Sequence, residues 1–311
     1  MLKSIVRRLY KLVLGDEVRT SLASLSLLKL VFLLRNNGSQ TAAITGFDAR
    51  NVLVLAPHMD DEVLGCGGIL RLHALAGAKI TVIFMTDGSK GNPELYRGEL
   101  PDEVIAARER ELRIERRNES GKAAAILGID ELVFLDCADG GLQPSPEVVE
   151  RVLRIILERR PQIIYHPSIF DLHPDHWATN RVLHAATMAF EGRDDWQPVY
   201  RGYEVWTPAV INRIADISEV IQAKQDAVAQ FGSQLAHTDF ARTLLGLNAY
   251  RSLHHASGHG YAEAFHESLP ALYSVLMQQL SSSPGRGIRA SIEAIKCDCA
   301  RPQRSRRDRK D

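Results

Sequence analysis

The stretch Asn51-Val52-Leu53-Val54-Leu55-Ala56-Pro57-His58-Met59-Asp60-Asp61-Glu62 determines both the expected fold and the expected site. Its first half is a short apolar run rich in Val and Leu, which is typical of a buried strand. The run ends at a histidine and three consecutive acids. Three adjacent carboxylates at the end of a buried strand repel one another and lose hydration unless a cation is bound. Because His and Asp are ligands of Zn²⁺ and similar metals, the stretch predicts one half of a metal site.

An alternation of strands and helices follows this opening. Short apolar runs predict three further strands, at 79–85, 131–137 and 162–165. Helical patterns lie between and after them, at 63–75, 102–127, 146–160 and 177–190. This alternation is typical of an α/β protein with a Rossmann-like, doubly wound, mostly parallel sheet and helices on both faces. Beyond it we expect one or two strands within 203–217, and then helices at 218–231 and 258–276.

The composition fits one α/β domain with an extension at each end. The 311 residues are 45% hydrophobic and 24% charged with zero formal net charge, so the charge gives no reason to expect a nucleic-acid partner. We expect a helical N-terminal extension over 1–47, the main domain over 48–280, and a basic, disordered tail over 281–311. The apolar stretch from Leu22 to Leu34 is too short and too interrupted to span a bilayer.

The cysteines and the N-terminus predict where the protein resides. Cys66 and Cys137 fall inside expected core elements and Cys297 and Cys299 fall in the tail, so no disulfide framework is expected. No convincing signal peptide is present, which predicts a cytoplasmic protein. The basic residues of the N-terminus and the tail leave open a peripheral contact with the inner face of the membrane.

The second half of the expected site is His173-Pro174-Asp175-His176, at the start of the helix that follows the fourth strand. In a parallel sheet the carboxyl ends of the strands meet at one edge, so this motif should lie beside residues 58–62. His58, Asp61 and His176 then supply three metal ligands, and three protein ligands with an open position indicate a catalytic rather than a structural zinc. We expect one Zn²⁺ per chain, although the same ligands also accept Fe²⁺, Mn²⁺ or Co²⁺.

Two neighbours of these ligands suit proton transfer. Asp60 is adjacent to a ligand but should point elsewhere, so it is expected to take a proton from the metal-bound water. His173 should stand on the far side of the open position. As an imidazolium it is expected to stabilise an oxyanion and to pass a proton to the leaving group.

These motifs carry a family resemblance. The run from Leu55 to Gly68 resembles the "PHPDDE" signature of the PIG-L/LmbE-like zinc de-N-acetylases, and Asp171-Leu172-His173-Pro174-Asp175-His176 resembles their "D-x-HPDH" motif. Weaker similarities to the bacterial branch occur around Asp87, Arg116, Asp139, Trp206, Lys224, Gln234 and Glu263. The resemblance covers about residues 48–268. Met59 stands where the family usually has proline, so we expect a looser turn there.

The resemblance implies a Rossmann-like fold, the metal ligands and catalytic pair named above, and removal of an N-acetyl group from an N-acetylglucosamine-type sugar or glycoconjugate. Five residues are candidates for substrate binding: Asp87, Lys90, Arg97, Asp139 and Asp171. Arg108 is a further candidate for a phosphate or hydroxyl contact. Two alternatives stay open, namely a metal-dependent amidase acting on a non-sugar amide and a non-catalytic sugar-binding module in glycan assembly. The sequence does not reveal which sugar is bound or the oligomeric state.

Overall fold

A computed structural model describes residues 41–98, 100–190 and 196–282 of the chain. The helices expected within residues 1–35 and the cysteines at 297 and 299 lie outside the described residues, as does the tail beyond 282. The described residues up to Met277 belong to one structural unit, and this unit contains the sheet and the site.

The described strands form one eight-stranded sheet in the order β1-β7-β8-β6-β5-β2-β3-β4. In chain order they are β1 (Ala42–Ala43), β2 (Asn51–Ala56), β3 (Lys79–Thr86), β4 (Glu131–Cys137), β5 (Ile163–Pro167), β6 (Val199–Tyr203), β7 (Arg213–Asp216) and β8 (Ala262–Ser268). Every pairing is parallel except the two that β8 makes. The expected mostly parallel α/β sheet is therefore confirmed.

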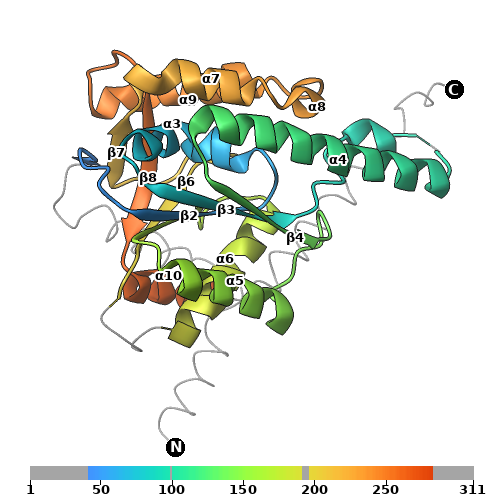
Figure 1. Cartoon of the computed structure of the whole chain (residues 1–311), viewed down its shortest axis with the longest axis horizontal. Coiled ribbons are helices and arrows are strands. Elements are labelled where there is room, and N and C mark those ends of the chain that lie inside the picture. The colour runs from blue at the N-terminus through green and yellow to red at the C-terminus, as the bar shows by residue number, and fades with distance from the viewer. Residues whose placement is uncertain (1–40, 99, 191–195, 283–311) are drawn as a thin grey trace, which may run out of the picture. The chain divides into compact units, whose positions relative to one another are not determined.

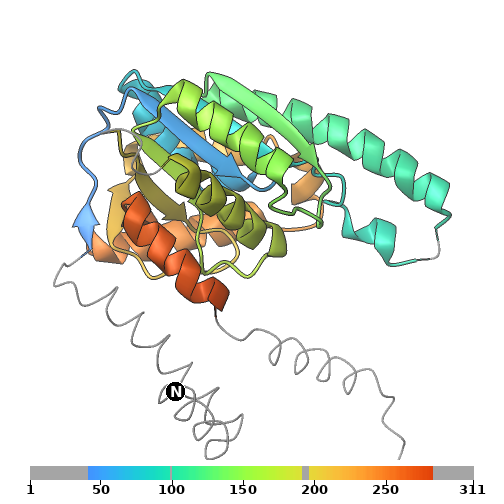
Figure 2. The same cartoon turned by 90° about the horizontal axis from the view of Figure 1, so that it is seen from below.

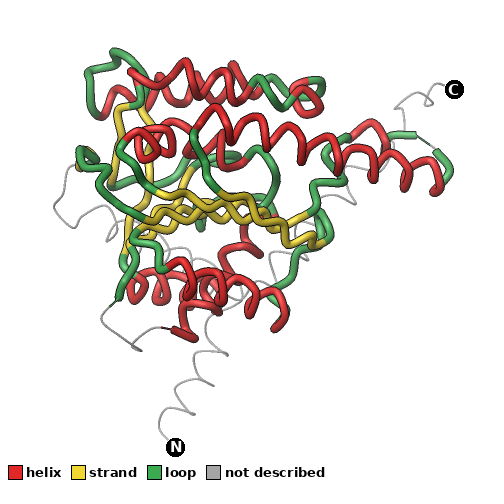
Figure 3. The backbone as a smooth tube through the Cα atoms, in the orientation of Figure 1, coloured by secondary structure: helices red, strands yellow, loops and turns green. Residues whose placement is uncertain are grey.

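Helices cover both faces of this sheet (Figures 1 and 3). One face carries α3 (Asp61–Leu75), α4 (Asp102–Leu127), α7 (Ile221–Val228), α8 (Gly232–Leu235) and α9 (Phe240–Arg251). The other face carries α5 (Pro146–Arg159), α6 (Pro174–Phe190) and α10 (Pro270–Ser282), which lie side by side in Figure 2. Short 3₁₀ turns occur at η1 (Pro93–Tyr96), η2 (Ser218–Val220) and η3 (Ser252–His254). None of the described helices has the length and hydrophobicity that a membrane crossing needs.

Local signals place the ends of two helices where the sequence predicts them. The hydroxyl of Ser145 accepts the backbone N–H of Val148 at 3.3 Å, which caps α5 ahead of Pro146. Helix α4 ends at Gly128, whose φ of 79° lies in the left-handed region that glycine adopts easily. Both boundaries depend on contacts within a few residues, which explains why they are readable from the sequence.

The helix expected over 258–276 is wrong, because its first half is strand β8. This strand inserts antiparallel between β6 and β7, and six of its seven residues are buried. Ala262 and Glu263 have little intrinsic preference for strands, so tertiary contacts override the local pattern here. Helix α10 begins only at Pro270. Residues 42–43, expected in the N-terminal extension, pair with β7 and extend the sheet.

Candidate metal and catalytic site

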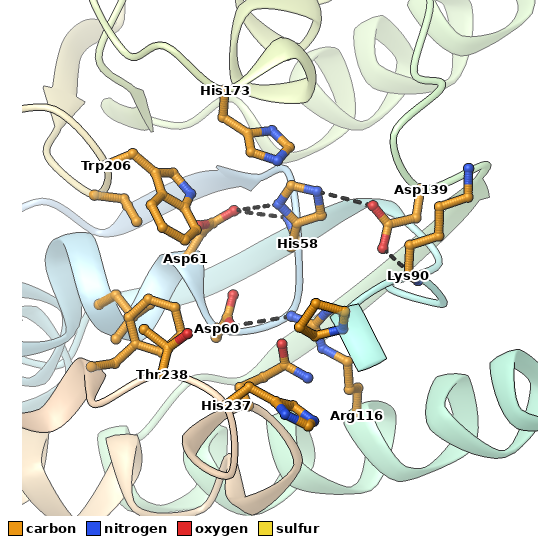
Figure 4. A pocket seen from close by; sticks show the side chains of 16 residues that line it. His58, Asp60, Asp61, Lys90, Arg116, Asp139, His173, Trp206, His237 and Thr238 are labelled. Carbon is orange, nitrogen blue, oxygen red and sulfur yellow. Dashed lines mark hydrogen bonds and ion pairs between the residues drawn. The ribbon is translucent and has the colours of Figure 1, made fainter. Parts of the chain in front are cut away.

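The polar clusters of the sequence meet at one edge of the sheet. The loops that follow β2, β3, β4, β5 and β6 surround a pocket of about 230 Å³, and the segment from Gln234 to Phe240 closes its other side (Figure 4). This is the expected position, because ligands of parallel α/β sheets bind beyond the carboxyl ends of the strands.

The carboxylate of Asp61 lies between two imidazoles. Its Oδ2 is 3.2 Å from Nδ1 of His58 and 3.2 Å from Nε2 of His176. His176 is fully buried, and no hydrogen bond within the described part of the chain satisfies its Nε2. Two nitrogens and one oxygen this close together suit a divalent transition metal, and Nε2 of His176 is then a metal ligand and needs no hydrogen bond. The ring nitrogens of His58, His173 and His176 also lie within 4.8 Å of one another, which makes His173 an alternative ligand.

The other ring nitrogen of His58 faces two carboxylates. Nε2 is 3.2 Å from Oδ2 of Asp175 and 3.3 Å from Oδ1 of Asp139. Burial alone would lower the pKa of His58, but these two carboxylates and Asp61 raise it well above its usual value. A carboxylate behind a histidine fixes the ring and directs its other nitrogen to a metal. This role of Asp175 is not evident from the sequence, although the residue lies between the two histidines of the second motif.

Asp60 occupies a strained backbone conformation at the start of α3. Its φ of 142° is unusual for a residue other than glycine, and such outliers gather at functional sites. The amide of Asp60 donates to Glu62 at 3.1 Å, and its Oδ2 lies 3.1 Å from Nη2 of Arg116. Burial raises the pKa of the Asp60 carboxyl to about 7, although the guanidinium opposes the shift. A carboxyl group that titrates near neutral pH is suited to exchanging protons.

Arg116 also anchors the turn before Asp60. Its Nη2 donates to the carbonyl of Met59 at 2.6 Å, and its Nη1 donates to the carbonyl of Gly88 at 3.2 Å. From the sequence, Arg116 is notable only as one of the weaker similarities to the family, with no predicted role in the site. The side chain of Met59 is fully buried in the core. Nothing in these contacts tests whether the turn is looser than one with proline, so that expectation stays a prediction.

One ring nitrogen of His173 accepts a hydrogen bond and therefore carries no proton. Its Nδ1 accepts the backbone N–H of Asp175 at 3.2 Å. Burial and the neighbouring rings of His58 and His176 lower the pKa of His173. With Nδ1 accepting this bond, Nε2 is the ring nitrogen that can donate a proton towards the pocket. These contacts do not test whether the ring becomes the imidazolium expected from the sequence, so that expectation stays a prediction. The ring remains a hydrogen-bond donor on the side away from Asp175.

Asp171 holds several parts of this edge together. Its Oδ1 accepts the amide of His173 at 3.0 Å, and its Oδ2 accepts the amide of Trp206 at 3.1 Å. The same Oδ2 lies 3.3 Å from Nδ1 of His176. Asp171 does not line the pocket, so the structure favours an orienting role over the expected contact with substrate.

The remaining candidate residues divide into two groups. Lys90 and Asp139 line the pocket, and the amide of Lys90 donates to Asp139 at 2.9 Å. Asp87 lies outside the lining and pairs with Arg113 at 2.5 Å. Arg97 and Arg108 are exposed and also lie outside the lining. Sequence reasoning gave no site role to the pocket residues Trp206, Gln234, His237, Thr238 and Phe240, because they follow no ligand motif and are distant in the chain.

Strand β8, which the sequence does not predict, stabilises helix α3 through hydrogen bonds. The helix carries Asp61 in its first turn and is broken at Cys66, whose φ of −145° and ψ of 17° are not helical. Glu263 of β8 accepts the amides of Gly68 and Ile69 just beyond the break, each at 2.8 Å. These amides begin the second segment of the helix and would otherwise lack partners.

Lys224 of α7 completes this support. Its Nζ donates to Oε1 of Glu263 at 2.7 Å and to the carbonyl of Leu64 at 2.9 Å. Neither side chain of the pair is exposed. The ion pair therefore binds both sides of the break and fixes the turn that presents Asp61 to the pocket.

The chain is similar to known deacetylases in sequence and fold. Residues 53–187 match the family model PIG-L, described as GlcNAc-PI de-N-acetylase. A diacetylchitobiose deacetylase of Thermococcus kodakarensis is 27% identical over 237 residues, which cover 70% of this chain and 82% of that protein. A probable N-acetyl-alpha-D-glucosaminyl L-malate deacetylase 2 of Bacillus cereus is 30% identical over 197 residues, which cover 60% of this chain and 84% of that protein. The solved N,N'-diacetylchitobiose deacetylase from Pyrococcus horikoshii has the same fold, with a TM-score of 0.61 at 23% identity over 80% of this chain and 94% of that chain.

Proposed function

Since the chain belongs to the PIG-L family of de-N-acetylases, we propose that it is a metal-dependent hydrolase that removes the acetyl group from an N-acetylglucosamine-type sugar. The observation that carries the proposal is the placement of Asp61 between His58 and His176. Asp60 and His173 line the same pocket beside these three residues (Figure 4). Together they supply the parts that amide hydrolysis needs.

His58, Asp61 and His176 are the proposed metal ligands, and Zn²⁺ is the metal that best suits this donor set. A metal held by these residues would supply a Lewis acid and would lower the pKa of a water molecule towards 7. His58 is positioned by the carboxylates behind its Nε2, so that Nδ1 is the nitrogen that remains for the metal.

The proton steps belong to two residues of this chain. Asp60 takes a proton from the water that attacks the amide carbonyl, and Arg116 holds the carboxylate in place. The Nε2–H of His173 donates a hydrogen bond to the oxyanion that develops on the carbonyl oxygen. Asp60 then returns its proton to the departing nitrogen, so that water and the amide yield acetate and the free amino sugar.

Acetate release from a panel of N-acetylglucosamine conjugates tests the proposal. We expect activity that disappears when a chelator removes the metal and returns on adding Zn²⁺. Asp60→Asn should lower kcat by about 10²- to 10⁴-fold while metal content stays constant. Asp226→Asn on the exposed part of α7 is the matched control and should behave as wild type.

Two results would contradict the proposal. Turnover that survives complete metal removal would exclude a metal-dependent mechanism. Turnover of simple acetamides without any turnover of acetamido sugars would favour the amidase acting on a non-sugar amide.

A cytoplasmic location, with a basic terminus contacting the membrane surface, also stays a proposal and is tested by cell fractionation.

A further inference from the structure

Trp206 is exposed at a place where an exposed indole is unfavourable. It follows the end of β6 and lines the pocket, yet 52% of it is accessible to solvent. Large aromatic surfaces that stay in contact with water lose the hydrophobic free energy that burial provides. An indole held in this position beside a reactive site can regain that free energy when a ligand covers it.

The indole is held in a fixed orientation relative to the site. Phe240 packs edge-on against it, with ring centroids 5.7 Å apart and an interplanar angle of 75°. The ring of His173 lies nearly parallel to it at 6.3 Å and 21°. The backbone of Trp206 is bound to Asp171, which also binds the amide of His173. One carboxylate therefore positions both the proposed oxyanion donor and the aromatic surface beside it.

The opposite side of the pocket is polar. Figure 4 shows Trp206 on one side of His58, with Asp139 and Lys90 on the other side and Arg116 below. A pyranose ring presents apolar C–H groups on its faces and hydroxyl groups around its edge. A pocket with one aromatic wall and one wall of donors and acceptors matches both kinds of surface.

We propose that Trp206 is a stacking platform for the sugar ring that carries the acetamido group. This inference rests on the proposed function, because it assumes that the amide is cleaved beside His173. The ring carbon that bears the amide nitrogen lies within about 3 Å of the carbonyl carbon. A ring attached this closely can cover an indole whose centroid is 6.3 Å from the ring of His173. The enzyme then selects cyclic acetamido sugars over acyclic acetamides through this contact.

The test compares two substrates that carry the same acetamido group, of which only one has that group on a sugar ring. One is a simple N-acetylglucosaminide and the other is N-acetylethanolamine, which has the same amide without a ring. Trp206→Ala should lower kcat/KM for the sugar by about tenfold or more, while the value for the acyclic amide changes less than threefold. Trp206→Phe should recover most of the loss, and Trp206→Leu, which is apolar but not planar, should not.

Tyr250→Ala provides the control, because Tyr250 is an exposed aromatic residue on α9 that does not line the pocket. It should leave both substrates unaffected. An equal loss on both substrates in Trp206→Ala would overturn the inference and would show that the indole only supports His173. Full recovery by leucine would also overturn stacking. If the wild-type protein hydrolyses no acetamido sugar, the proposed function itself fails. If the wild-type protein is active on the sugar and Trp206→Ala is equally active, only the stacking inference fails.

Discussion

Replacing Lys224 with methionine should lower the stability of the protein strongly, because both side chains of its ion pair with Glu263 are fully buried. Methionine keeps most of the length and the apolar character of the stem but removes the charge. The carboxylate of Glu263 would then remain fully buried beside the break in α3 without its partner. The carbonyl of Leu64 would also lose its donor.

The expected loss is about 3–5 kcal/mol, because breaking a buried ion pair leaves an uncompensated charge in the protein interior. For a protein of this size, each kcal/mol corresponds to about 2–4 °C in Tm, so the midpoint should fall by about 6–20 °C. The double variant Lys224→Met with Glu263→Gln should be more stable than Lys224→Met alone, since no buried charge is left unpaired. It should stay below wild type, because a glutamine offers one acceptor oxygen to the amides of Gly68 and Ile69.

Denaturant unfolding of the single and double variants measures these differences. Arg154→Met is the matched control, because Arg154 pairs with Glu150 on the solvent-exposed face of α5 and should contribute at most about 0.5 kcal/mol. A loss below about 1 kcal/mol for Lys224→Met would refute the reasoning. A double variant less stable than Lys224→Met would refute it as well.

Three further predictions concern the strained residue, a close packing contact and pH. Asp60→Gly and Asp60→Ala should both abolish activity, and both lose the ion pair with Arg116. Asp60→Gly should nevertheless be more stable than Asp60→Ala by about 1–3 kcal/mol, since glycine tolerates a φ of 142° better than alanine does; an equal or lower Tm for the glycine variant would contradict this. Gly65→Ala should lower the stability of the protein by about 1–3 kcal/mol, because the new Cβ would lie 2.2 Å from the ring of Tyr203. In Gly121→Ala the new Cβ meets no atom within 4 Å, so this variant should stabilise α4. Thermal unfolding of the two variants tests both expectations. Burial lowers the pKa of His73 to about 4, so the unfolded state takes up a proton first as the pH falls. Stability should therefore decrease between pH 6.5 and 4 by up to about 3 kcal/mol, and His73→Gln should reduce that slope in unfolding curves measured at pH 7 and 5.

The parts of the fold that follow local rules could be predicted from the sequence. The buried strands β2 and β3 appear as continuous apolar runs, and the ends of α4 and α5 appear as a glycine and a capping serine. The two motifs of the site could also be placed at one edge of the sheet, because parallel strands bring their carboxyl ends together.

The rest depends on contacts between distant residues. The sequence of β8 predicts a helix because its alanines and glutamates suit helices, and only pairing with β6 and β7 makes it a strand. Arg116 shows the same limit within the site. It lies in a helix rich in arginine, and although the family resemblance includes it, nothing in the local pattern shows that its side chain reaches Met59 and Asp60.

The support of α3 has a consequence for how the protein is made. The amide of Gly68 and its acceptor Glu263 are 195 residues apart in the sequence. At a synthesis rate of about 5–20 residues per second, the loop at 58–62 leaves the ribosome about 10–40 s before the strand that will hold it. Contacts of such sequence separation form slowly. A nascent chain that carries both ligand motifs but ends before residue 262 would lack the contacts of Glu263 that support the helix carrying Asp61. The site therefore cannot acquire its working geometry before β8 has been synthesised and has joined the sheet.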